Sequence, residues 1–247
     1  MTGRRYLLCS HLLALGLVFE ASAQDPGEDS FRRLREKMVQ EQMADPPDYR
    51  EPVRTPEVLK AMRTVPRHHF VERKLQSSAY GDFPLPIGYG QTISQPYIVA
   101  LMTEMLEVRP GHKVLEVGAG SGYQAAVLSL LVKEVFTVEI VKELALQAEE
   151  RLKRLQYANV RVKVGDGFYG WEEEAPFDRI IVTCAASLVP PPLLKQLKPE
   201  GKMCIPVGAA YSVQYLTMVE KSETGAITMR RTIPVRFVPL TRSGKEQ

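Results

Sequence analysis

Strands and helices alternate along the second half of the chain, and this alternation is what most constrains the fold. Segments with helical composition separate short apolar segments that have the length of buried strands. The expected strands are 113–117, 135–139, 160–164, 179–183 and 202–207, and the expected helices are 125–131, 142–155 and 193–197. Strands that alternate with helices form a parallel sheet covered on both faces. The sequence therefore predicts an α/β fold with a doubly wound, mostly parallel, Rossmann-like sheet.

The two ends of the chain depart from this pattern. Residues 213–219 and 226–235 alternate like strands without a helix between them, which indicates an antiparallel hairpin at one sheet edge. Upstream of the sheet, we expect an N-terminal helical cap. Its expected helices cover 31–43, a short segment that starts at Thr55-Pro56, and an amphipathic segment from Gln95 onward. Residues 24–30, the proline-rich 44–56 and 76–94 are expected to be loops.

The first 23 residues have the pattern of a secretory signal peptide. Arg4 and Arg5 precede an apolar stretch at 12–19 that is too short to span a bilayer, and Ala21-Ser22-Ala23 offers a cleavage site. An unprocessed extension, or a wrongly chosen start codon, is the alternative. Residues 24–247 are then expected to form one domain. Residues 24–110 hold the N-terminal helices and a substrate loop, and 111–247 hold a cofactor-binding sheet.

Charge and cysteine content exclude other classes of function. The formal charge is only +3, and no block of lysine and arginine with interleaved aromatic residues occurs, so no nucleic-acid partner is expected. Three cysteines make no disulfide framework: Cys9 belongs to the signal, whereas Cys184 and Cys204 lie in apolar segments and are expected to be buried thiols. Cysteine and histidine spacings typical of zinc sites are absent, so no metal is expected.

A glycine-rich loop follows the first expected strand of the sheet. Gly118, Gly120 and Gly122 allow a sharp turn and a close approach of a ligand to the backbone, and the helix that follows offers free N–H groups. Glu139 ends the next strand, 17 residues after Gly122, where a carboxylate can accept hydrogen bonds from ribose hydroxyls. Together these features predict a nucleotide-like cofactor.

Acidic residues at strand ends indicate which cofactor this is. The spacing Gly-x-Gly-x-Gly differs from the usual dinucleotide pattern, and Glu116 lies two residues before it. A carboxylate there would repel a pyrophosphate but suits the ammonium and sulfonium groups of S-adenosylmethionine. The alternative is a surface carboxylate at a strand end. Asp166 ends the third strand and is placed either to meet the adenine amino group or to form a plain turn.

The segments 87–97 (Ile-Gly-Tyr-Gly-Gln-Thr-Ile-Ser-Gln-Pro-Tyr) and 114–123, together with 137–140, 164–167 and 176–182, resemble the protein-L-isoaspartate O-methyltransferase family. Val65-Pro-Arg-His68 and 235–241 extend the resemblance, which covers about residues 30–242. The Gln-Thr-Ile-Ser-Gln-Pro segment is much more specific than the glycine loop. The resemblance implies a class I methyltransferase fold with S-adenosylmethionine as cofactor and isoaspartyl-containing proteins and peptides as partners.

The resemblance also implies roles for single residues. Ser94 corresponds to the family's active-site serine, and Thr92, Ile93 and Val238 to positions that meet the substrate. The three glycines would lie against the methionine part of the cofactor, with Glu139 on the ribose and Asp166 near the adenine. From the residues alone, Ser94 is expected as the N-cap of the helix at Gln95-Pro96, and the two roles are compatible. His68 and His69 are expected to be structural.

The chemistry implied by the family requires no general base, because a carboxylate is already a nucleophile and a sulfonium is a good leaving group. Alignment then supplies most of the acceleration, about 7–11 kcal/mol at best. The resemblance thus implies methyl esterification of L-isoaspartyl carboxylates. We expect a monomer that has no stable membrane association after signal removal. A non-catalytic binding scaffold and a methyltransferase for another carboxylate are the alternatives. The predictions of location conflict: the family implies the cytoplasm, and residues 1–23 imply the periplasm.

Overall fold

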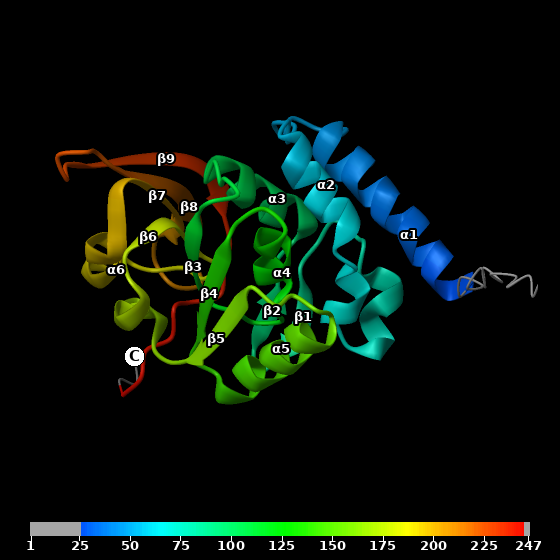
Figure 1. Ribbon diagram of the computed structural model, residues 1–247. Helices are drawn as coiled ribbons and strands as arrows, with labels where there is room; N and C mark the ends of the chain where they lie inside the picture. The colour runs from blue at the N-terminus through cyan, green and yellow to red at the C-terminus, as the bar shows by residue number, and fades with distance from the viewer. Residues whose placement is uncertain (1–25, 245–247) are drawn as a thin grey trace, which may run out of the picture.

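The computed structural model describes residues 26–244, and a seven-stranded sheet forms the centre of the molecule (Figure 1). The strand order is β5-β4-β3-β6-β7-β8-β9. The five strands β3 to β7 are parallel, and β8 and β9 continue the sheet as an antiparallel hairpin at its edge. This confirms the predicted fold class. The strands are β3 (Lys113–Val117), β4 (Glu134–Glu139), β5 (Val160–Val164), β6 (Phe177–Val182), β7 (Leu197–Val207), β8 (Gln214–Lys221) and β9 (Ile227–Val235).

Both faces of the sheet are buried, because successive strand residues point to opposite sides. One face carries Val114 and Val135 and packs against the fully buried helix α4 (Tyr123–Ser129) and against α3 (Pro96–Met105). The other face carries Leu115 and Phe136 and packs against α6 (Pro191–Gln196). Helix α5 (Lys142–Arg154) adds Leu152 to the first cluster. The two clusters make the sheet a rigid support for the loops at its ends.

The N-terminal layer lies beside α3 and α4 (Figure 1). It comprises α1 (Pro26–Val39), a π-helical turn η1 (Gln40–Ala44), α2 (Pro56–Thr64), the 3-10 turns η2 (Arg67–Phe70) and η3 (Arg73–Ser78), and the small hairpin of β1 (Leu85–Gly88) and β2 (Gln91–Ile93). Pro56 occupies the first turn of α2 as predicted.

Two loop predictions in this layer are wrong. Helix α1 already begins at Pro26, inside the expected loop 24–30, because Glu28 and Asp29 in its first turn favour the positive end of the helix dipole. Segment 76–94 contains β1 and β2, whose four and three residues are too short for hydrophobic periodicity to reveal. The predicted signal peptide lies outside the described residues.

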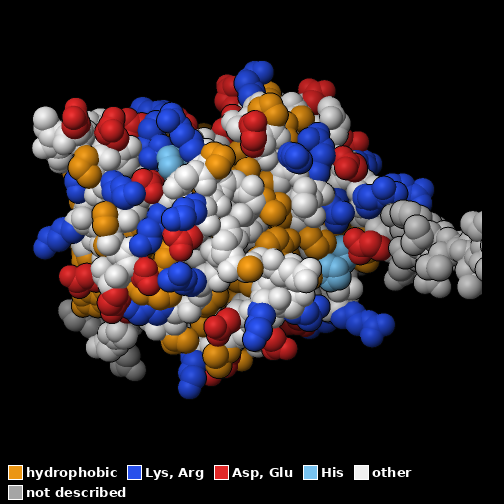
Figure 2. Space-filling view, viewed as in Figure 1, with side chains coloured by type: hydrophobic (Ala, Val, Ile, Leu, Met, Phe, Trp, Pro, Cys, Tyr) orange, Lys and Arg blue, Asp and Glu red, His pale blue; other side chains and the backbone are white. Residues whose placement is uncertain are grey.

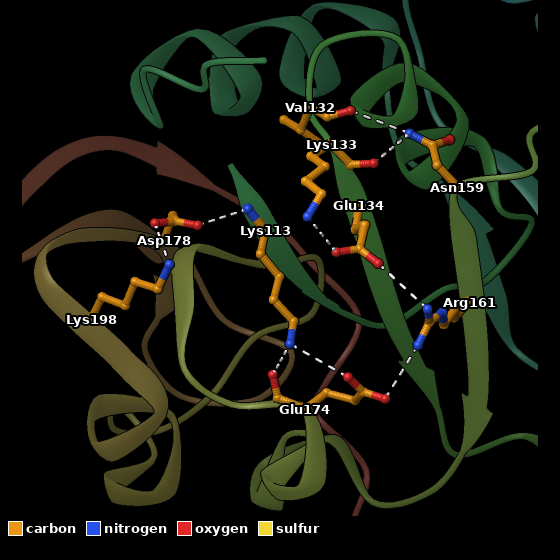
Figure 3. Close-up of polar contacts among 9 residues, drawn as sticks. All are labelled: Lys113, Val132, Lys133, Glu134, Asn159, Arg161, Glu174, Asp178 and Lys198. Atoms are coloured by element: carbon orange, nitrogen blue, oxygen red, sulfur yellow. Dashed lines mark hydrogen bonds and ion pairs between the residues drawn. The ribbon is translucent and has the colours of Figure 1, made fainter. Parts of the chain in front are cut away.

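A polar network closes the amino ends of the parallel strands (Figure 3). Lys113 at the start of β3 donates its side chain to the main-chain oxygen of Glu174, and its main-chain N–H donates to Asp178 (2.7 Å). Arg161 on β5 bridges Glu134 and Glu174, each at 3.4 Å. Ion pairs therefore hold this edge of the sheet together.

The surface shows no single-sign charge field on the face in Figure 2, where basic and acidic side chains are interspersed. Within residues 26–244, no helix combines the length and the apolar character needed to cross a membrane.

Candidate active site

The carboxyl ends of the parallel strands surround a hollow at the point where the strand order reverses. The chain continues from β3 to β4 on one side, while β6 pairs with β3 on the other, and ligands bind in such crevices. We call this hollow the glycine pocket. Its lining comes from the loops after β3, β4, β5 and β6, from the β2 strand and from the C-terminal segment: Gln91, Thr92, Val117, Gly118, Gly120, Val138, Glu139, Ile140, Gly167, Thr183, Cys184, Val238, Pro239, Leu240 and Thr241.

The glycine loop has the conformation that only glycine adopts without strain. Gly118 has φ +97°, and a Cβ atom there would lie 2.5 Å from the hydroxyl oxygen of Thr183. Gly120 lines the pocket next to it. Gly122 (φ +85°) lies further back, as the residue before α4, and faces Leu152 instead of the pocket. Sequence reasoning thus placed Gly118 and Gly120 in the hollow, whereas Gly122 serves the turn and the close packing of α5.

Glu139 joins the end of β4 to the glycine loop. Its two carboxylate oxygens accept hydrogen bonds from the main-chain N–H groups of Gly120 (2.8 Å) and Val141 (2.9 Å). The side chain is only 6% exposed and lines the pocket. The carboxylate retains free lone pairs toward the hollow, since an ionised carboxylate has about four acceptor positions.

Asp166 faces the C-terminal segment instead of the hollow. Its carboxylate accepts from the main-chain N–H of Phe168 (3.0 Å), from Arg242 (3.0 Å) and from the main-chain N–H of Ser243 (3.1 Å). Only the next residue, Gly167, lines the glycine pocket. Arg242 in turn lies over the Phe168 ring, 3.6 Å from its centroid. The C-terminal segment is thereby fastened across this side of the pocket.

Glu116 is buried behind the glycine loop, so the alternative of a surface carboxylate is wrong. The residue is 0% exposed, and neither carboxylate oxygen has a hydrogen-bond partner among the described residues. Thr137, its neighbour in the β3–β4 register, has an unpartnered hydroxyl as well. Burial raises the pKa of Glu116 to about 8; the nearby Thr137 hydroxyl opposes this rise, and the carboxylate of Glu139 adds to it. A buried carboxyl group without a hydrogen-bond partner is what we expect at a site that binds a cation.

Ser94 lines a second hollow, a groove of about 700 Å³ that we call the Ser94 groove. The residue lies between β2 and α3, half-buried, and its hydroxyl makes no hydrogen bond to any described residue. Gln95, not Ser94, is the N-cap of α3, so that prediction is wrong; Pro96 at the first helical position shifts the start by one residue. Arg236 is the only charged residue of the groove lining.

The two hollows share a wall. Thr92, Thr183 and Val238 line both the glycine pocket and the Ser94 groove. A third, smaller hollow brings Ser94, Ile93 and Glu116 together with the glycine loop. The structure therefore unites residues predicted from two separate sequence segments at one junction.

Sequence reasoning missed Thr183, which lines all three hollows. Its hydroxyl donates to the main-chain oxygen of Gly118 (2.7 Å). Its position directly after β6, where the strand order reverses, could have identified Thr183 as a site residue from the sequence. Cys184 and Cys204 are buried free thiols, as predicted.

His68 and His69 lie in the N-terminal layer, outside the three hollows. Together with Glu28 they form the only group of three potential metal ligands within residues 26–244. Both ring nitrogens of His68 are already engaged, by Tyr80 (2.7 Å) and by Glu28 (3.2 Å), and Phe31 stacks on its ring. Burial lowers the pKa of His68 to about 4. A satisfied, neutral histidine suits a structural role.

A buried carboxylate behind a glycine loop favours a cationic ligand over a pyrophosphate, and the sheet supplies the matching frame. This combination defines a class I methyltransferase that uses S-adenosylmethionine. The comparisons with known proteins narrow the class. A family model described as protein-L-isoaspartate(D-aspartate) O-methyltransferase (PCMT) matches residues 39–245. The chain belongs to this family.

Individual relatives agree with this assignment. Protein-L-isoaspartate O-methyltransferase 1 of Cupriavidus necator is 60% identical over 185 residues, which cover 75% of this chain and 71% of the relative. The enzyme of the same name from Nitrosospira multiformis is 51% identical over 233 residues, covering 93% and 94%. A solved protein-L-isoaspartate O-methyltransferase superposes with a TM-score of 0.71 at 29% identity, covering 86% of this chain and 65% of that one. A beta-aspartate methyltransferase (PCMT) from Plasmodium falciparum, in complex with S-adenosyl-L-homocysteine, gives 0.69 at 27%, covering 85% and 98%.

Proposed function

We propose that this protein methylates the free carboxylate of L-isoaspartyl residues in damaged proteins and peptides, with S-adenosylmethionine as donor, and so initiates their repair. The observation that carries the proposal is the shared wall of Thr92, Thr183 and Val238 between the glycine pocket and the Ser94 groove. A donor in the pocket and a peptide in the groove would meet at this wall.

The cofactor end of the site matches its ligand in charge and shape. We assign Glu116 to the cationic part of the donor, Gly118 and Gly120 to the methionine part, and Glu139 to the ribose. Gly122, which the family resemblance also placed on the methionine part, faces Leu152 and contributes the turn that holds this loop. When bound, S-adenosylmethionine supplies a methyl group on a sulfonium that is displaced by a carboxylate oxygen. For Asp166 we propose the adenine side, reached once Arg242 and Ser243 share or release its carboxylate.

The substrate carboxylate is already a nucleophile, so the substrate end of the site only has to orient it. The free hydroxyl of Ser94 can donate a hydrogen bond to the substrate carboxylate and fix the direction of its attacking oxygen. Thr92, Ile93 and Val238 form the surrounding wall, and Val238 already uses its main-chain oxygen to accept from Ala185 (2.8 Å).

The proposal is tested with two peptides that differ only at one residue. Purified protein and methyl-labelled S-adenosylmethionine are incubated with an L-isoaspartyl peptide and with its aspartyl twin. Label should enter the first and not the second. Equal labelling would point to another carboxylate substrate. Tight cofactor binding without any transfer would point to a binding scaffold.

We also propose that residues 1–23 are removed as an export signal and that 24–247 act as one monomeric domain. Intact mass of the protein from its native host should then begin at Gln24, and light scattering should give one copy per particle. A chain that retains Met1 or its neighbours in the mature protein would contradict export by this route.

A further inference from the structure

The most unusual buried group outside the assigned roles is Arg67 in η2. Its side chain is 0% exposed. Among the described residues, no carboxylate forms an ion pair with it, and its Nη1 atom has no hydrogen-bond partner. Burial lowers the pKa of Arg67 only to about 10, so the group stays charged at neutral pH. An isolated buried charge costs several kcal/mol of stability, and its presence calls for an explanation.

The contacts of Arg67 converge on the active site. Its Nε donates to the main-chain oxygen of Ala79 (2.8 Å), and its Nη2 donates to the main-chain oxygen of Ser94 (2.7 Å). The guanidinium lies 4.9 Å from the centroid of the Tyr123 ring, at the start of the helix after the glycine loop. Tyr123 lines the same small hollow as Ser94 and Glu116. Arg67 thus fixes the serine segment from behind.

A purely mechanical role does not require a charge. A neutral donor could tie two carbonyl groups together without the desolvation cost of a buried cation. A fixed positive charge in a low-dielectric interior, however, acts strongly on a nearby anion. The proposed substrate brings an anion, its α-carboxylate, to the hydroxyl of Ser94. Because the guanidinium is fully buried behind the Ser94 main chain, we expect it to act through the Ser94 segment and not by direct contact with the substrate.

We propose, on the basis of the proposed function, that Arg67 is a positioning residue. It fixes the Ser94 main chain and holds a positive charge beneath it that attracts the substrate carboxylate without contacting it. Arg67 should therefore control KM for the isoaspartyl peptide and leave cofactor affinity unchanged.

The test compares Arg67→Met, which keeps the apolar stem, with Arg67→Lys, which keeps a charge. Assays run at pH 6.5, because burial lowers the pKa of an ammonium and the lysine must be protonated. Arg67→Met should raise KM at least tenfold, change the Kd for S-adenosyl-L-homocysteine less than twofold, and leave Tm equal or higher. Arg67→Lys should keep KM within threefold of the wild type.

Arg35→Met is the matched control, since Arg35 is also buried but contacts Arg63 and Tyr80 in the N-terminal layer. It should change Tm without changing KM. The inference is overturned if Arg67→Met has normal KM, if KM and cofactor Kd rise together, or if a folded Arg67→Lys is more than tenfold impaired in KM. Should Arg67→Met fail to fold, the lysine variant decides alone. A wild type that methylates no isoaspartyl peptide refutes the proposed function instead.

Discussion

Replacing Glu116 with glutamine should stabilise the ligand-free protein, and increasingly so as pH rises. The carboxyl group is fully buried without a hydrogen-bond partner, which raises its pKa from 4.5 to about 8. Below pH 4.5 the group is protonated in both the folded and the unfolded chain. As pH rises toward 8, the unfolded chain loses this proton while the folded one retains it, so the free energy of unfolding falls.

The size of the effect follows from the width of the pH range between the two pKa values of Glu116, 4.5 in the unfolded chain and about 8 in the folded one. Each pH unit inside it costs the wild type about 1.4 kcal/mol, whereas a glutamine at this position does not titrate. Between pH 5.5 and 7.5 the stability gap between variant and wild type should grow by about 2 to 3 kcal/mol. For a domain of this size that corresponds to a growth of about 5 to 10 °C in the difference of Tm.

Urea unfolding of ligand-free wild type and Glu116→Gln at pH 5.5, 6.5 and 7.5 measures the gap directly. Other groups titrate equally in both proteins and cancel in the difference. Glu223→Gln serves as the control, because it makes the same chemical change at an exposed position on the β8–β9 turn. A gap that is constant over this pH range would refute the reasoning. The stabilised variant should also bind S-adenosylmethionine more weakly, because the carboxylate that faces the cation is gone.

Three further substitutions test, in turn, the alignment of the substrate by Ser94, the space for the cofactor at Gly118 and the structural role of the ion pairs at Glu174. Ser94→Ala should lower kcat about 10- to 150-fold, which corresponds to the loss of one hydrogen bond to a charged group, and should leave the cofactor Kd unchanged. Ser212→Ala in the same groove should leave kcat unchanged. Gly118→Ala should abolish cofactor binding measured by calorimetry, because its Cβ meets Thr183 at 2.5 Å, whereas Gly225→Ala, with a similar φ of +87° and open space, should only lower Tm. Glu174→Gln at the opposite sheet edge should cost less than about 1 kcal/mol of stability and leave kcat/KM unchanged; reduced turnover would show that the two edges are coupled.

The sheet was predictable because each strand is a continuous apolar segment between turn residues, and burial on both faces requires such a segment. Strands β3 and β5 match the sequence-based bounds at both ends. The hairpin of β1 and β2 was not predictable, since its strands are too short to show periodicity. Its position matters for function, because Ser94 directly follows β2.

Parts of the site depend on contacts between distant segments, which local sequence does not encode. Arg67 lies in a segment whose pattern indicates only structure; its burial depends on Ala79 and Ser94, 12 and 27 residues away. Asp166 was identified from its strand end, but its hydrogen bonds to Arg242 and Ser243 span 76 and 77 residues. Glu116 was found because its position before the glycine loop is itself informative.

Arg67 and Glu116, whose carboxyl group gives up its proton when a cation binds beside it, are both expected to act on binding more than on the chemical step. A sulfonium and a carboxylate react to give a thioether and an ester, so both ligand charges disappear during transfer. Groups that attract these charges stabilise the substrates more than the transition state, and such interactions lower KM without raising kcat. Acceleration must then come from alignment by the Ser94 hydroxyl and the shared wall. After transfer the ester product carries no charge at the carboxyl group that Arg67 attracts, and the donor has lost its sulfonium charge but keeps its ammonium group. The loss of these two charges weakens the attraction to the buried side chains and favours release of the products.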